Sequence, residues 1–263
     1  MKTKVLFAIL IAMMLGMTIP ARVNSQVVIA LLFGDKLNSP GIKFGLDGGI
    51  DFANLTNSNS AKFTHGLNLG LYLDILLKKN TNWYIHTGLI LKSPMGGDGL
   101  NPYLLNDPQL DTMFATGKIK RELRYINVPI LVRYKFKNQL FLEAGPMIGV
   151  LVKATDIFYN TVDDKDDISY KNNIYKKCNL FDAGIMGGIG YHFMKGTGMN
   201  LGVRYYYGFL PVTTEDSYGT GQNQSIYAFI SIPIGAGEKS KAKAAAKAQK
   251  KQEKKEKKEQ EKN

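Results

Sequence analysis

The chain has 263 residues, among them 27 glycines, 14 tyrosines and 13 phenylalanines but only 9 prolines, a composition that excludes a disordered chain and a helical bundle. Its formal net charge of +12 is concentrated at the ends, because residues 1–25 carry +3 and residues 238–263 carry 11 lysines against 5 glutamates. The body in between is close to neutral for its length, which excludes a basic nucleic-acid-binding surface, so we expect no nucleic acid partner.

The N-terminus has the layout of a secretory signal peptide. Lys2 and Lys4 precede an apolar run over residues 5–15, and Pro20 interrupts the chain soon after that run. The run is too short to span a membrane as a helix, which disfavours the alternative of a membrane anchor. We therefore predict that residues 1–25 are a signal peptide and that the protein is exported.

Residues 26–41 are predicted to form an N-terminal periplasmic segment. Their apolar run, residues 27–33, could plug the base of a barrel, add a strand or lie at the membrane rim, and the sequence leaves these three possibilities open. Cys178 is the only cysteine of the chain, so an internal disulfide is impossible.

The clearest strand pattern lies in residues 63–77. Apolar side chains occupy nearly every odd position, whereas the even positions include Asn68, Gly70, Tyr72 and Asp74. A period of two is that of a β-strand, and a long apolar face opposite a polar one is typical of a strand between lipid and a polar interior. One side of this sheet is therefore expected to face lipid.

Seven further segments have the same character. The eight predicted strands are residues 42–55, 63–77, 83–91, 120–136, 140–152, 180–193, 199–210 and 224–234. An even number of strands is what a bacterial barrel with both termini on one side requires. We predict an all-β fold, an eight-stranded antiparallel transmembrane β-barrel over residues 42–235, in the cell outer membrane.

The predicted connections alternate between short and long. The short turns are residues 78–82, 137–139 and 194–198, and the long loops are residues 92–119, 153–179 and 211–223, with residues 56–62 as a short exception on the long-loop side. Outer-membrane barrels have short periplasmic turns and long extracellular loops, so we expect the long loops outside the cell. A soluble β-sandwich has no reason for this alternation, although lipocalin-like barrels can approach it.

Four stretches resemble the signature regions of PorT-like outer-membrane β-barrel proteins, a group of small porin-like barrels. They are residues 123–134 (LRYINVPILVRY), 141–146 (FLEAGP), 181–190 (FDAGIMGGIG) and 204–208 (RYYYG). The resemblance covers residues 42–235 and implies the barrel fold rather than one activity. The member for which the family is named is implicated in type IX secretion, and the lysine-rich tail is not part of the family pattern.

The predicted inward faces carry charges that need partners wherever they are buried. We expect the acidic residues to meet the basic ones inside the barrel as a structural network rather than a transport site. The acidic residues are Asp47, Asp51, Asp74, Glu143 and Asp182, and the basic ones are Lys43, Arg133 and Arg204. Glycines 184, 188 and 190 also fall on the inward face, where small residues let other side chains fill a narrow lumen.

Candidates for catalysis are few, so we predict no catalytic, cofactor-binding or metal-binding residue and no enzyme. His65, His86 and His192 lie on three separate strands without metal-ligand spacing. His65 near serines 58 and 60 is the one placement that a lipid hydrolase could use, and we interpret it as a rim position. The acidic run 163–167 lacks the turn glycine of a known calcium loop, so we expect a solvated loop there.

Residues 236–263 form a lysine-rich tail that we expect to be helical or disordered. It has no apolar face, so it is either a flexible charged extension or a tether for anionic polymers or lipid phosphates. The function expected from the sequence is a structural, binding or secretion-associated role without an open pore. The alternatives are a lipid-modifying enzyme and a small-solute porin. The expected partners are outer-membrane lipids and a protein bound at the extracellular loops or the tail.

Overall fold

The computed structural model describes residues 41–56, 61–77, 81–162, 165–193, 198–219 and 221–234. The predicted signal peptide, the lysine-rich tail and all but Gly41 of the segment 26–41 lie outside these ranges, so what was predicted for them stays a prediction. None of the helices within these ranges is long and apolar enough to cross a membrane.

The described chain forms one antiparallel sheet of nine strands. Its strands are β1 (Ile42–Leu55), β2 (Thr64–Leu76), β3 (Trp83–Leu100), β4 (Lys118–Lys135), β5 (Leu140–Val162), β6 (Lys165–Asn173), β7 (Phe181–His192), β8 (Asn200–Pro211) and β9 (Gln222–Pro233). One short helix, α3 (Pro108–Phe114), and two 3₁₀ turns, η2 (Tyr175–Lys177) and η4 (Asp216–Tyr218), lie in the connections.

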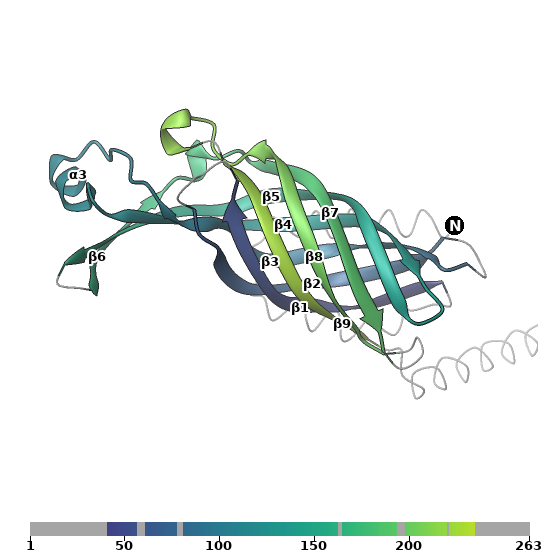
Figure 1. Cartoon of the computed structure of the whole chain (residues 1–263). Coiled ribbons are helices and arrows are strands. Elements are labelled where there is room, and N and C mark those ends of the chain that lie inside the picture. The colour runs from purple at the N-terminus through teal and green to yellow at the C-terminus, as the bar shows by residue number, and fades with distance from the viewer. Residues whose placement is uncertain are drawn as a thin grey trace, which may run out of the picture.

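The sheet closes on itself into a barrel (Figure 1). Strands β1 to β5 pair in chain order, as do β7 to β9. The ring is completed where β5 pairs with β7 and where β1 pairs with β9. The strand β6 pairs with β5 alone, beyond the ring. Closure removes the exposed sheet edges that an open sheet would have to protect. The predicted eight-stranded barrel is therefore confirmed, and each of its strands overlaps a predicted one.

The two faces of the barrel wall have opposite chemistry. On β2 the inward positions Asn68, Tyr72 and Asp74 are buried, whereas Leu67 and Leu69 on the alternate positions are exposed. The outward positions of β4, β5, β7 and β8 repeat this pattern with exposed isoleucine, leucine and valine. A continuous exposed apolar surface of this kind is unfavourable in water and favourable in lipid.

Aromatic side chains flank the apolar surface at both ends of the barrel. At the end with short turns, Trp83 and Tyr134 have ring centroids 4.7 Å apart, and Tyr191 and Phe193 are 5.0 Å apart. At the other end Tyr207 contacts Phe209 on the same outward face of β8. Rings of this type are preferred at the two interfaces of a membrane.

The prediction that residues 92–119 and 153–179 are long loops was wrong in part, because much of both segments is strand. The strand β3 continues to Leu100, and β5 continues to Val162 and pairs there with β6. At Gly96 the backbone φ of 111° is one that residues with a side chain rarely adopt, and a Cβ there would lie 2.1 Å from the Arg121 carbonyl oxygen. Glycine thus lets β3 continue through an irregular register toward the end of the strand.

The long connections fold together over one end of the barrel, and we call the described residues among 93–124, 153–179 and 212–218 the cap. Figure 1 shows α3 and β6 projecting beyond the ring at this end. Phe158 of β5 contacts Phe114 of α3 and Tyr103, and Tyr103 in turn contacts Tyr218 of η4. The cap therefore has an apolar core of its own, continuous with the upper barrel interior.

The predicted alternation of the connections is confirmed. The loops β1 to β2, β3 to β4, β5 to β7 and β8 to β9 meet at the cap end, and the turns β2 to β3, β4 to β5 and β7 to β8 meet at the opposite end, which we call the turn end.

The cap makes a prediction about Cys178, which lies buried in its core. Burial raises the pKa of this thiol to about 12, so almost none of it is the reactive thiolate at neutral pH. We expect a membrane-impermeant maleimide to leave Cys178 unlabelled in intact cells and to label it after denaturation. The comparison protein carries Cys178→Ser and Leu104→Cys, because Leu104 in the cap is 75% exposed. Equal labelling of both proteins in intact cells would show that the cap is not folded as described.

Candidate functional site

The barrel interior is held by charged side chains that meet at its centre. Arg204 of β8 donates from Nε to Glu143 Oε1 of β5 at 2.6 Å and from Nη1 to Asp47 Oδ2 of β1 at 2.7 Å. Arg133 of β4 donates from Nε to the other oxygen of Glu143 at 2.8 Å and from Nη1 to Asp74 Oδ2 of β2 at 2.9 Å. Glu143 therefore joins the two arginines, and all five groups are at least nine-tenths buried.

His86 of β3 completes the group, which we call the interior network: Asp47, Asp74, His86, Arg133, Glu143 and Arg204. Its Nε2 lies 2.9 Å from Arg204 Nη2, and its Nδ1 lies 2.6 Å from Asp74 Oδ1. An arginine can only donate, so Nε2 accepts and Nδ1 carries the proton that it donates to Asp74. His86 thus orients the Asp74 carboxylate through this hydrogen bond.

Aromatic rings cover the flat faces of both guanidinium groups. The Arg204 guanidinium carbon lies 3.7 Å from the centroid of the Phe229 ring of β9, and that of Arg133 lies 4.3 Å from the ring of Phe141 of β5. The carboxylates hold the edges of each guanidinium and a ring holds its face. Both arginines are buried by these contacts.

Gly188 of β7 leaves the space that this packing needs. A Cβ at Gly188 would lie 2.9 Å from Arg204 Cγ and 3.2 Å from Glu143 Oε1. Ser231 of β9 donates to the second oxygen of Asp47 at 2.9 Å. With these two residues every strand of the ring contributes to the network or to the space that it fills.

The inward face of the cap end is filled by large side chains. The largest fully buried ones there include Tyr125, Tyr206 and Tyr227, packed with Met147 and Met186. The Tyr227 hydroxyl is bonded to Ser93 Oγ at 2.9 Å. The interior thus changes from charged at the centre to aromatic and apolar beneath the cap.

The expected membership of the network is confirmed for five residues and wrong for Asp51 and Asp182. Asp47, Asp74, Glu143, Arg133 and Arg204 meet as predicted. Asp51 is buried but pairs with none of the predicted cations, because it lies further toward the cap end of β1. Asp182 accepts a hydrogen bond from Asn223 at 2.9 Å, and Lys43 lines a pocket at the turn end.

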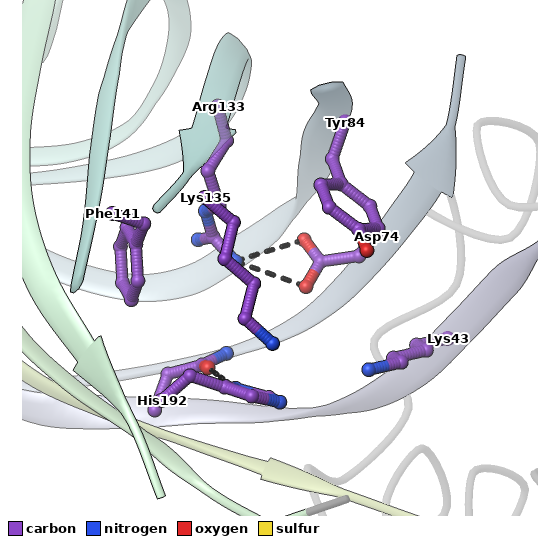
Figure 2. A pocket seen from close by; sticks show the side chains of 8 residues that line it. Lys43, Asp74, Tyr84, Arg133, Lys135, Phe141 and His192 are labelled. Carbon is purple, nitrogen blue, oxygen red and sulfur yellow. Dashed lines mark hydrogen bonds and ion pairs between the residues drawn. The ribbon is translucent and has the colours of Figure 1, made fainter. Parts of the chain in front are cut away.

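That pocket lies below the network, with Asp74 and Arg133 in its wall (Figure 2). Its empty space of about 300 Å³ is open to solvent, and Lys43, Lys135 and His192 line it as well. Figure 2 shows the two lysine side chains on opposite sides of this space. The pocket is small and cationic, and it ends at the ion pair between Arg133 and Asp74.

A second buried ion pair, in the cap, was not predicted. Arg121 of β4 forms two parallel hydrogen bonds to Asp156 of β5, both 2.8 Å long, and donates a third to the carbonyl oxygen of Tyr218 at 2.9 Å. This pair ties two strands to η4. The even spacing of Ala154, Asp156 and Phe158 was the available signal that β5 continues, because all three face inward there.

The histidines do not form a metal or catalytic cluster within the described ranges. No group of three or more histidine, cysteine or acidic residues there could hold a metal ion. His65 is exposed on β2, opposite Phe52, and the serines expected beside it lie outside the described residues. Of the acidic run 163–167, the backbone of Lys165 onward belongs to β6.

A family model described as an outer membrane protein beta-barrel domain matches residues 35–214, more than half of the chain. The chain belongs to this family. It is an outer-membrane β-barrel protein, as the apolar exterior and the closed sheet predict. The match does not extend to the narrower PorT-like group. No curated protein matches the chain.

Several solved outer-membrane proteins are similar in structure at low identity. Ail, the attachment invasion locus protein of Yersinia pestis, is 10% identical with a TM-score of 0.40, and the match covers 74% of this chain and 100% of Ail. Neisserial surface protein A is 11% identical with a TM-score of 0.35, over 74% of this chain and 99% of that one. OprG from Pseudomonas aeruginosa is 9% identical with a TM-score of 0.32, over 73% and 93%.

The close fit at Gly188 makes a prediction about stability. Gly188→Ala would press a methyl group against Arg204 and the Val203 carbonyl, so we expect the free energy of unfolding to fall by about 1 to 3 kcal/mol. The matched control is Gly187→Ala, because a Cβ there has no atom closer than 3.9 Å. Urea unfolding in phosphatidylcholine vesicles measures both. Equal midpoints for the two variants would mean that the interior is loosely packed at this point.

Proposed function

We propose that this protein is a closed outer-membrane barrel that presents a folded cap for binding outside the cell. The observation that carries the proposal is the interior network, because its side chains reach across the barrel from opposite walls. Arg204 alone joins β8 to β5 and β1 at distances of 2.6 and 2.7 Å. A barrel of this size has room for side chains but little room for a channel as well.

The small pockets beside the network support a closed interior over a porin. One pocket is lined by Asp74 and Arg133 at the turn end, and another is lined by Asp47 and Arg204 on the other side of the network. These two pockets share no lining residue. A solute would have to break buried ion pairs to move from one to the other, and such pairs are costly to separate inside a protein.

The cap supports a binding role. Outer-membrane barrels place their short turns in the periplasm, which puts the cap outside the cell. Its strands and helix are held by the pair of Arg121 and Asp156 and by a shared aromatic core, so it is ordered rather than a set of free loops. Leu104 and Met113 remain exposed on it, as anchors of a protein interface often are. We propose a binding role without enzymatic activity, because contacts made by exposed side chains of the cap need no catalytic group.

The arrangement of the interior also favours the narrower PorT-like group and, through it, a secretion-associated role. Residues 123–134, 141–146, 181–190 and 204–208 carried the resemblance, and one residue from each lies at the network. These residues are Arg133, Glu143, Gly188 and Arg204. Four stretches that are separate in the sequence thus each contribute a residue to the same buried site, which supports treating them together as one family signature.

A closed barrel predicts negligible conductance. We expect the full-length protein in planar phosphatidylcholine bilayers to give no stable single-channel steps, because the interior network and the tyrosines above it occupy the lumen. A change in gel mobility on boiling verifies that the reconstituted barrel is folded, and a general porin serves as the positive control. Large, stable steps from the folded protein would overturn the proposal in favour of a small-solute porin.

A further inference from the structure

The outer face of the cap sheet carries a cluster of basic side chains, formed by Lys120 and Arg124 of β4, Lys153 of β5 and Lys171 of β6. We call these four residues the rim cluster. The alternate residues Arg121, Leu123, Ala154 and Asp156 are buried in the cap, so the rim cluster occupies the opposite, solvent side. Arg124, Lys153 and Lys171 are exposed, and Lys120 is half-buried.

The cluster continues the lipid-facing surface of the barrel. Arg124 lies on the cap side of the outward positions Ile126, Val128 and Ile130 of β4, and Lys153 comes directly after the exposed Val152 of β5. Two residues of strand span roughly 7 Å, so Arg124 lies one short step beyond the apolar surface. That is the level at which the headgroups of the outer leaflet begin.

Arg124 and Lys153 face each other across β4 and β5. Like charges directly opposite in an antiparallel pair are destabilising. No ion pair or side-chain hydrogen bond is found for either residue within the described ranges. An anion between the two cations would remove their repulsion.

A second row of the same sheet enlarges the cluster. Lys120 lies opposite Ile157, and Ile157 lies opposite Lys171. The single acidic residue on this face of β4 is Glu122, whose Oε1 lies 3.3 Å from Lys120 Nζ. At the same end of the barrel the outward positions of β8 are Tyr207 and Phe209, which carry no charge.

We infer that the rim cluster binds the phosphate of an outer-leaflet lipid, with Arg124 and Lys153 as its principal contacts. The proposal commits to a lipid rather than a soluble anion because the cluster borders the apolar surface on the same face of the same strands. Acyl chains can then lie against Val150 and Val152 while the phosphate meets the two cations. The inference uses the placement of the cap at the outer leaflet and does not depend on a closed lumen.

The test compares two double variants of the full-length protein in zwitterionic detergent. Arg124→Gln with Lys153→Gln removes the facing pair, and Lys62→Gln with Lys137→Gln removes two exposed lysines elsewhere as the matched control. The probes are bisphosphorylated lipid A, the same lipid without phosphates, and inorganic phosphate. A basic residue at a membrane surface contributes about 1 kcal/mol, or about fivefold in affinity, so losing two should weaken lipid A binding by about 30-fold.

Support requires that wild type and the control bind phosphorylated lipid A alike and more tightly than its dephosphorylated form, and that the facing-pair variant loses this preference. The inference is overturned if the facing-pair variant binds as tightly as wild type. Displacement of the lipid by inorganic phosphate at equal concentration would also overturn it, because the site would then recognise a free anion.

Thermal unfolding supplies a second readout that does not depend on affinity. Without anionic lipid the facing-pair variant should unfold at a higher temperature than wild type, because the repulsion is gone. With lipid A present the order should reverse. If the facing-pair variant still unfolds at the higher temperature when lipid A is present, the inference is contradicted. Conductance measured on the same samples tests the closed lumen separately.

Discussion

The bridge that Arg204 makes between Asp47 and Glu143 is the interaction on which the interior depends. It joins three strands that lie far apart in the chain, and it does so where bulk water cannot replace a lost partner. Removing one member of such a group leaves its partners buried and charged, which costs several kcal/mol. Three further residues support this bridge. Gly188 leaves space for the Arg204 side chain, the Phe229 ring covers the face of its guanidinium, and His86 lies within hydrogen-bond distance of its Nη2.

The membrane reverses the usual arrangement of a small protein. Apolar side chains cover the outside of the barrel, so its interior is left to hold polar groups together by pairing. The cap lies outside this environment and follows the ordinary rule, with Phe114 and Phe158 inside and lysines on its surface. A buried ion pair appears in both parts, but Arg121 and Asp156 in the cap join only neighbouring strands and a turn, whereas the interior network spans the whole ring.

Much of the barrel could be predicted because a period of two specifies which side of a strand each residue occupies. That rule placed Arg133, Glu143 and Arg204 inside, and opposite charges in a closed space then had to meet. The sequence did not predict that His86 belongs to the network, because a single histidine on a strand forms no pattern that indicates its partners. Asp51 was wrongly assigned to the network because the alternation of residues along a strand shows which face a side chain occupies but not its height along the barrel axis. That height follows from the pairing register of the strands. The continuation of β5 was missed because polar residues occupy both of its faces in the cap.

The most direct test of the interior network is a double-mutant cycle between Asp47→Asn and Arg133→Gln. These two residues do not pair with each other, but Asp47 binds Arg204, Arg133 binds Glu143, and Arg204 joins Glu143. If the network is one connected unit, the free energies of unfolding of the single and double variants in lipid vesicles should differ from additivity by about 0.5 kcal/mol or more. Additive effects within about 0.3 kcal/mol would show that the two arginines act independently and that no single network fills the barrel.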